Sequence, residues 1–137
     1  MRTFFKVFKL NVGEKKWQEM ATLIGTPDSN IHFVAPDIGY LVRTDEIYDP
    51  DKRKFVLDQP QLYKTIDGGI TWSQVGDLSG LSLKRDVFLF GDQNELTIVE
   101  RTKSRVLIGE NEGSSWKSVD LVEAYDGVRE LLRRGTK

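Results

Sequence analysis

The sequence predicts an all-β chain of short antiparallel strands that ends in one α-helix. First, runs of aromatic and β-branched residues alternate with turn residues along most of its 137 positions. Second, an eight-residue pattern that ends in tryptophan occurs twice, at 65–72 and 109–116, so the two tryptophans lie 44 positions apart (116 − 72). Third, only the last segment, 120–135, has the apolar periodicity of a helix. We therefore expect a meander of repeated sheet units with a terminal helix.

Residues 1–25 predict a hairpin, which we interpret as an incomplete first unit. Its strands are expected at 4–10 and 17–23, where aromatic and apolar residues are frequent. Asn11 and Gly13 supply the turn between them.

Residues 26–79 predict a second unit that carries a long insertion. Its strands are expected at 31–35, 40–43, 61–65 and 71–75. The stretch 45–60 is longer than a hairpin of this unit needs, and Asp49-Pro50-Asp51-Lys52 at its centre favours a type I turn. We interpret 45–60 as a protruding β-arm.

Residues 80–119 predict a third unit, with strands at 86–91, 95–100, 105–108 and 116–119. The helix expected over 120–135 begins with Asp120 and Glu123 in a capping-box spacing, and Gly135 is a stop signal. An open array of sheets leaves an unpaired strand edge, and an amphipathic helix is one way of covering it.

The two eight-residue segments, called the first octad (65–72) and the second octad (109–116), share one pattern of small, acidic or amide, glycine, hydroxyl and tryptophan residues. In the first octad these residues are Thr65, Asp67, Gly69, Thr71 and Trp72. In the second they are Gly109, Asn111, Gly113, Ser115 and Trp116. Asn11, Gly13 and Trp17 make a weaker third copy in which the tryptophan comes one place late.

This pattern resembles the Asp-box, or BNR repeat, of sialidase-like β-propellers. The resemblance implies a partial propeller-like meander of about two and a half to three blades. Because a closed propeller needs about 4 to 8 blades, a chain of this length cannot close a ring alone.

The octads are expected to stabilise hairpin turns rather than to perform chemistry. Asp67 is short enough to accept hydrogen bonds from its own loop, Gly69 permits a positive φ, and Trp72 packs a large ring between strands. The resemblance also implies that such boxes lie away from the active-site mouth of the enzymes that carry them.

Composition argues against several kinds of function. The net charge of −1 provides no basic field for nucleic acid, and the absence of cysteine removes disulfides, thiolate metal sites and a cysteine nucleophile. His32 is the single histidine, so a zinc site with two histidines is excluded. We expect no enzymatic activity, no metal and no cofactor.

The compartment expected from the sequence is the cytoplasm. Lys6 and Lys9 interrupt the apolar N-terminal stretch before a signal-peptide core can form. No run of about 18 apolar residues predicts a membrane span.

The best candidate for recognition is the β-arm. Tyr48 and Phe55 lie on opposite limbs, with Asp49 and Asp51 at the turn, and aromatic anchors with a charged rim suit a protein interface. We therefore expect a non-catalytic protein-binding module, of the inhibitor, immunity-protein or assembly-factor type.

Two alternatives stay open. In the first, several chains assemble a lectin-like propeller as a homo-oligomer that binds glycans, with Trp17, Tyr40 and Trp72 as stacking candidates. A sialidase-like hydrolase is the other, for which the resemblance implies an arginine cluster, a Tyr and Glu pair and an acidic Asp. No motif of this chain matches that set, although Arg43 and Arg105 are candidates for testing it.

Overall fold

The computed structural model describes residues 3–76, 78, 81, 83, 86–92, 94–101, 105–110 and 115–120. This part of the chain contains eleven β-strands and no α-helix, which confirms the predicted all-β class. The strands are β1 (Phe4–Asn11), β2 (Lys16–Ile24), β3 (Thr26–Pro27), β4 (His32–Phe33), β5 (Gly39–Asp49), β6 (Lys54–Thr65), β7 (Ser73–Gln74), β8 (Val87–Gly91), β9 (Leu96–Glu100), β10 (Arg105–Glu110) and β11 (Ser115–Asp120). Asp120, expected as the first helical residue, is the last residue of β11, and the rest of the helix expected over 120–135 lies outside the described residues.

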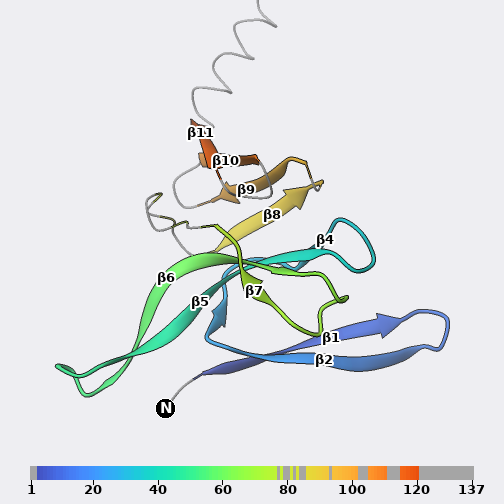
Figure 1. Ribbon diagram of the computed structural model, residues 1–137, viewed down its shortest axis with the longest axis horizontal. Helices are drawn as coiled ribbons and strands as arrows, with labels where there is room; N and C mark the ends of the chain where they lie inside the picture. Colours follow the sequence, from blue (N-terminus) through green and yellow to red (C-terminus); the bar gives the residue numbers. More distant parts are fainter. Residues whose placement is uncertain are drawn as a thin grey trace, which may run out of the picture.

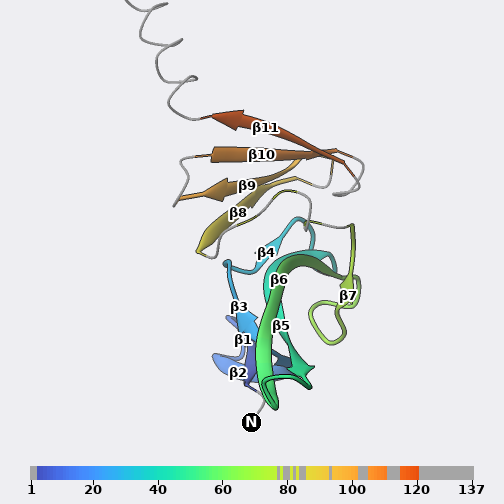
Figure 2. The same cartoon turned by 90° about the vertical axis from the view of Figure 1, so that its left-hand side faces the viewer.

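Three antiparallel sheets follow one another along the chain (Figures 1 and 2). The first is the β1–β2 hairpin. The middle sheet has the order β3-β5-β6-β7, with β4 also paired to β5, and the third has the order β11-β10-β9-β8. The order of each sheet is linear, so none of the three closes on itself.

Strand periodicity assigns one face of each large sheet to the core. In β8, Val87 and Leu89 are buried whereas Phe88 and Phe90 are exposed, as expected where side chains alternate between the two faces. Buried residues of the middle sheet pack against those of the third. The resulting cluster comprises Tyr40, Val42, Leu62, Leu78, Leu83, Val87, Leu89, Leu96, Ile98 and Leu107. The main hydrophobic core therefore lies between the middle and third sheets.

The outer edge of β8 is covered by residues 28–32 rather than by another strand. The Asn30 side chain donates to the carbonyl of Leu89 and accepts from its N–H, both at 2.8 Å. The Val87 N–H donates to the Asp28 carbonyl at 2.9 Å, and His32 Nε2 lies 2.6 Å from the Gly91 carbonyl oxygen. Since an unpaired edge exposes backbone groups to other strands, these bonds both protect β8 and join the two large sheets.

Replacing Asn30 tests this connection. Asn30→Ala leaves the Leu89 N–H and C=O without their partner, so we expect the free energy of unfolding to fall by about 2–3 kcal/mol. Urea denaturation measures this loss. Asn94→Ala, at an exposed position of the β8–β9 turn, is the matched control and should change stability by less than about 0.5 kcal/mol. Equal stability of the two variants would contradict the connecting role of Asn30.

Candidate functional site

Asp67 organises the first octad through hydrogen bonds to its neighbours. Its Oδ1 accepts from the N–H groups of Ile70 at 3.1 Å and Thr71 at 2.9 Å, and its Oδ2 accepts from the Thr71 hydroxyl at 2.5 Å. The Thr65 hydroxyl donates to Asp67 Oδ1 at 2.8 Å and accepts from the Gly69 N–H at 2.9 Å. The carboxylate thus accepts hydrogen bonds from two backbone N–H groups and two hydroxyls of the turn between β6 and β7.

These donors lower the pKa of Asp67. The pKa falls from the ordinary 3.8 to about 2, chiefly because the Thr71 hydroxyl and the Thr71 N–H bond the charged form. Partial desolvation opposes the shift, while the Thr65 hydroxyl and the Ile70 N–H add to it. The charged carboxylate is therefore the form that holds the turn, as a structural role requires.

Gly69 and Trp72 close the turn against other parts of the chain. Gly69 has a φ of 105°, a conformation that other residues rarely adopt, and its carbonyl accepts from the Trp72 ring nitrogen at 3.0 Å. Half-buried Trp72 makes an edge-to-face contact with Phe33 of β4, with ring centroids 6.4 Å apart. A Cβ placed on Gly69 would lie 3.9 Å from the Cβ of Met20, so the octad also borders the β1–β2 hairpin.

The second octad joins β10 to β11 in the same position of its sheet. Gly109 and Trp116 are paired across these strands, and a Cβ on Gly109 would come within 2.8 Å of the Trp116 ring. Glycine is therefore needed for the ring to lie over the strand. Ser115 is exposed at the start of β11. Asn111 and Gly113 lie outside the described residues.

Two hairpins place their tryptophan in a common register. Leu10 pairs with Trp17 and Gly109 with Trp116, each pair being the first and last residue of an eight-residue segment. In the β6–β7 hairpin the pairing ends at Lys64 and Ser73, one residue short of Thr65 and Trp72. Asn11 and Gly13 lie one place farther from Trp17 than Asp67 and Gly69 lie from Trp72.

The residues predicted for partner binding come together at the tip of the β-arm. Tyr48 pairs with Phe55 across β5 and β6, with ring centroids 5.5 Å apart in an edge-to-face contact. Asp49 Oδ1 accepts from the N–H groups of Asp51 at 2.9 Å and Lys52 at 3.3 Å, which stabilises the turn. A register shift between Thr44 and Glu46 marks where the arm leaves the packed part of the sheet. The arm projects well beyond the rest of the middle sheet (Figure 1).

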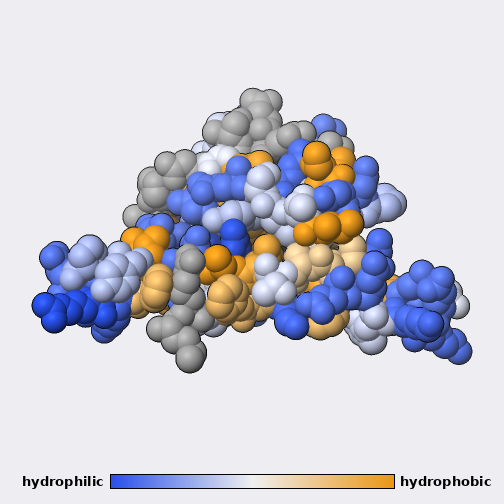
Figure 3. All heavy atoms as spheres, turned by 60° about the horizontal axis from the view of Figure 1, so that its bottom comes forward, coloured by the Kyte–Doolittle hydropathy of each residue, from blue (hydrophilic) through white to orange (hydrophobic). Residues whose placement is uncertain are grey.

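A second surface, an apolar groove, was not expected from the sequence. It has a volume of about 470 Å³ and is lined by Val7, Phe8, Lys9, Leu10, Met20, Ile31, Phe33, Pro36 and Gly68. Figure 3 shows hydrophobic side chains gathered in the middle of one face of the molecule, between hydrophilic groups at its two ends. The groove unites residues from separate strands, so the sequence holds no local signal for it.

Of the residues considered for catalysis and sugar binding, Arg43, Arg105 and Tyr40 are engaged in the fold, whereas Trp17 is exposed. Arg43 donates to the Ile24 carbonyl at 2.6 Å and lies 3.8 Å from the Tyr63 ring centroid. Arg105 donates to the Leu81 carbonyl at 2.8 Å and to the buried Glu100 carboxylate at 3.2 Å. Tyr40 is fully buried and cannot stack on a sugar.

The described residues contain no group of three or more His, Asp or Glu side chains that could hold a metal ion. Nor does this part of the chain include a helix with the length and apolar character that a membrane span requires.

Comparison with known proteins leaves the chain's own geometry as the basis for interpretation. No protein-family model matches the chain, and no curated protein or solved structure matches it.

The pKa of Asp67 gives a test of the octad network. Because the folded-state pKa lies below the ordinary 3.8, the charged network stabilises the fold above about pH 3.8 and loses this effect as the pH falls towards 2. The melting-temperature difference between the wild type and Asp67→Asn should therefore shrink over that interval. Carboxyl titration by NMR should give a midpoint near 2 and a higher one in Thr71→Val. A wild-type midpoint near 3.8 would contradict the network.

The different burial of Trp72 and Trp17 predicts different losses of folding stability when each is replaced by alanine. Trp72→Ala should lower the free energy of unfolding by about 2–3 kcal/mol, less than the cost at a fully buried site, because the ring is half-buried. Trp17 is 68% exposed, so Trp17→Ala should cost less than about 0.5 kcal/mol. Denaturant titration of both variants makes the comparison, and similar losses for the two would show the assignment of packing to be wrong.

Proposed function

We propose that this chain is a non-catalytic protein-binding module that recognises its partner with the tip of the β5–β6 arm. An inhibitor, an immunity-type protein or an assembly factor would act in this way, by covering or holding a surface of another protein. The observation that carries the proposal is the paired Tyr48 and Phe55 on a hairpin that projects from the packed sheets.

The arm offers apolar area in a form that suits binding. Tyr48 is 53% exposed, and Ile47 and Leu57 are each 48% exposed, although they occupy regular strand positions. Exposed aromatic residues that are already held by cross-strand pairing lose little side-chain freedom on binding. Interface hot spots are enriched in tyrosine for this reason and for its polar hydroxyl.

The charges around the aromatic pair suit a polar rim. Asp49 and Asp51 lie on one side of the turn, and Lys52, Arg53 and Lys54 follow them directly. A rim with both acidic and basic side chains contributes more to the choice and orientation of a partner than to the affinity for it.

We also propose that the sheets are propeller-type blades, the first of them incomplete, and that the segment after β11, up to residue 135, forms a helix that covers an open edge. The positions of the octads support the blades. Each octad joins the third and fourth strands of a four-position antiparallel order, since β3 and β4 both occupy the place beside β5. In this reading the β1–β2 hairpin supplies only the last two strands of its blade.

Removal of the aromatic pair tests the arm. Tyr48→Ala with Phe55→Ala should abolish capture of the native partner from extracts of the source cells, because both anchors are lost. The melting temperature should change little, since the arm lies outside the core. Quantitative affinity capture followed by mass spectrometry, with differential scanning fluorimetry on the same variant, measures both effects.

Ile66→Ala is the matched control, because Ile66 is 70% exposed at a turn away from the arm. It should capture the same proteins as the wild type. Intact capture by the double variant would contradict the arm as the binding surface. If light scattering instead finds particles of two or more chains that bind glycans independently of the arm, the lectin-like alternative is the better description.

A further inference from the structure

The outer edge of β1 differs from the other long sheet edge described above. Within the described residues β1 pairs with β2 alone, so its other side offers backbone groups to an additional strand. The comparable edge of β8 is covered by Asp28, Asn30 and His32. Lysines on an edge strand are one way in which natural proteins limit pairing, and β1 carries Lys6 and Lys9, so this edge disfavours a basic strand and stays open to an acidic one.

The apolar groove borders β1. Four consecutive residues of β1, at positions 7–10, line it, whereas β2 contributes Met20 alone. Successive side chains of a strand point to opposite faces, so a run of four lining residues includes backbone of β1 as well as its side chains. Met20 is the residue of β2 that the register shift leaves without a direct partner.

The far wall of the groove is apolar and is formed by a different sheet. Ile31, Phe33 and Pro36 make this wall, and Gly68 of the first octad closes it. Phe33 is itself held by the Trp72 ring and lies against Gly39, whose added Cβ would meet the Phe33 ring at 2.9 Å. The groove volume of about 470 Å³ lies within the range of roughly 300–1,000 Å³ that is typical of small-ligand sites. A groove of this volume can accommodate a few apolar side chains of one strand.

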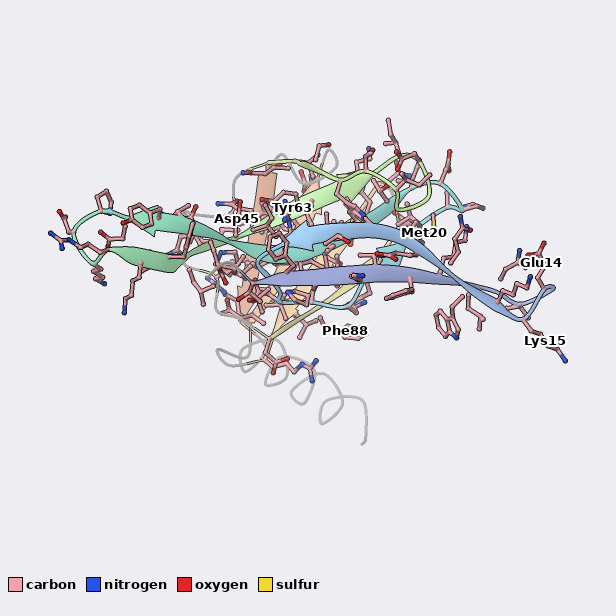
Figure 4. All side chains as sticks on the ribbon, turned by 90° about the horizontal axis from the view of Figure 1, so that it is seen from below. Glu14, Lys15, Met20, Asp45, Tyr63 and Phe88 are labelled. Atoms are coloured by element: carbon pink, nitrogen blue, oxygen red, sulfur yellow. The ribbon has the colours of Figure 1, made fainter. Side chains whose placement is uncertain are left out.

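The charges of the hairpin indicate what kind of strand fits. Lys6 forms an ion pair with Glu19 at 3.3 Å, but Lys9 lines the groove without an ion pair to any described residue. Lys15 lies beyond it at the hairpin tip, next to Lys16 and to Glu14 (Figure 4). A second copy of β1 would add Lys6 and Lys9 and no carboxylate, so the charge favours an acidic partner over self-pairing.

We propose that β1 accepts an extended segment of a partner protein as an added strand, with alternate apolar side chains in the groove and a carboxylate beside Lys9. Backbone hydrogen bonds to β1 provide affinity, and the groove provides specificity. The proposal rests on the proposed protein-binding function but uses a surface separate from the β-arm, which lies at the opposite end of the molecule from the hairpin tip (Figure 4).

Selection from a library of random ten-residue peptides displayed on yeast, with the full chain as bait, supplies the probe. Enriched peptides should alternate apolar with polar residues and carry at least one acid. In a resynthesised peptide, N-methylation of every second amide should weaken binding by about tenfold, because those amides face β1, and methylation of the intervening amides should have little effect. Isothermal titration calorimetry measures the affinities.

Charge reversal at the groove provides the second arm of the experiment. Lys9→Glu should weaken binding of the acidic peptide by about tenfold, and a peptide with lysine in place of the acid should recover it. Lys54→Glu, an equally exposed site on the β-arm, is the matched control and should bind as the wild type. Hydrogen exchange should show slowed amides within residues 6–10 when the peptide is present.

The outcomes separate this proposal from that for the arm. Tyr48→Ala with Phe55→Ala should keep full peptide affinity, even where it loses the cellular partner. The groove proposal is overturned if no alternating acidic peptides are enriched, if N-methylation shows no period of two, or if Lys9→Glu binds like the wild type. It is also overturned if light scattering shows a dimer in which hydrogen exchange already protects residues 6–10 without peptide.

Discussion

Burial of one face of each large sheet against the other is the constraint on which the rest of the structure depends. A sheet in water needs an apolar face covered, and a chain without cysteine has no disulfide to replace that burial. Val42, Leu62, Leu89 and Ile98 meet in the resulting core. Asn30 adds directional bonds to this burial, which is itself non-directional, and so helps define how the sheets sit on one another.

The octads serve this architecture by ending strands at defined places. Asp67 gathers donors within four residues of itself, so the turn between β6 and β7 is specified almost entirely by its own sequence. Trp72 and Trp116 then connect the hairpins to the tertiary structure, since Trp72 contacts Phe33 and Trp116 packs against the main core. The N-terminal hairpin keeps the register of Leu10 and Trp17 without such a carboxylate, and its tryptophan stays exposed.

Two surfaces of the described residues lie outside the main core and present apolar side chains. The β-arm carries an aromatic pair outside the core, whereas the β1 groove combines an open edge with apolar walls. They present different chemistry: a preformed protruding contact in one case and a recess beside free backbone groups in the other. Under the proposed function, the two surfaces would contact a partner at two separate points, and binding at two linked points is tighter than binding at either point alone.

Local features of this protein could be predicted from its sequence, because they depend on residues close together along the chain. The all-β class follows from two-residue periodicity, the first octad from the spacing of Thr65, Asp67 and Thr71, and the pairing of Tyr48 with Phe55 from the turn that separates them. What only the tertiary structure decided is which faces and edges are covered. Asn30 bonds a residue 59 positions away, and the groove joins residues 7–10 to 31–36. Burial depends on what packs above a strand, which no local pattern encodes, so Tyr40 is buried and Trp17 is exposed although both occupy strands of similar composition.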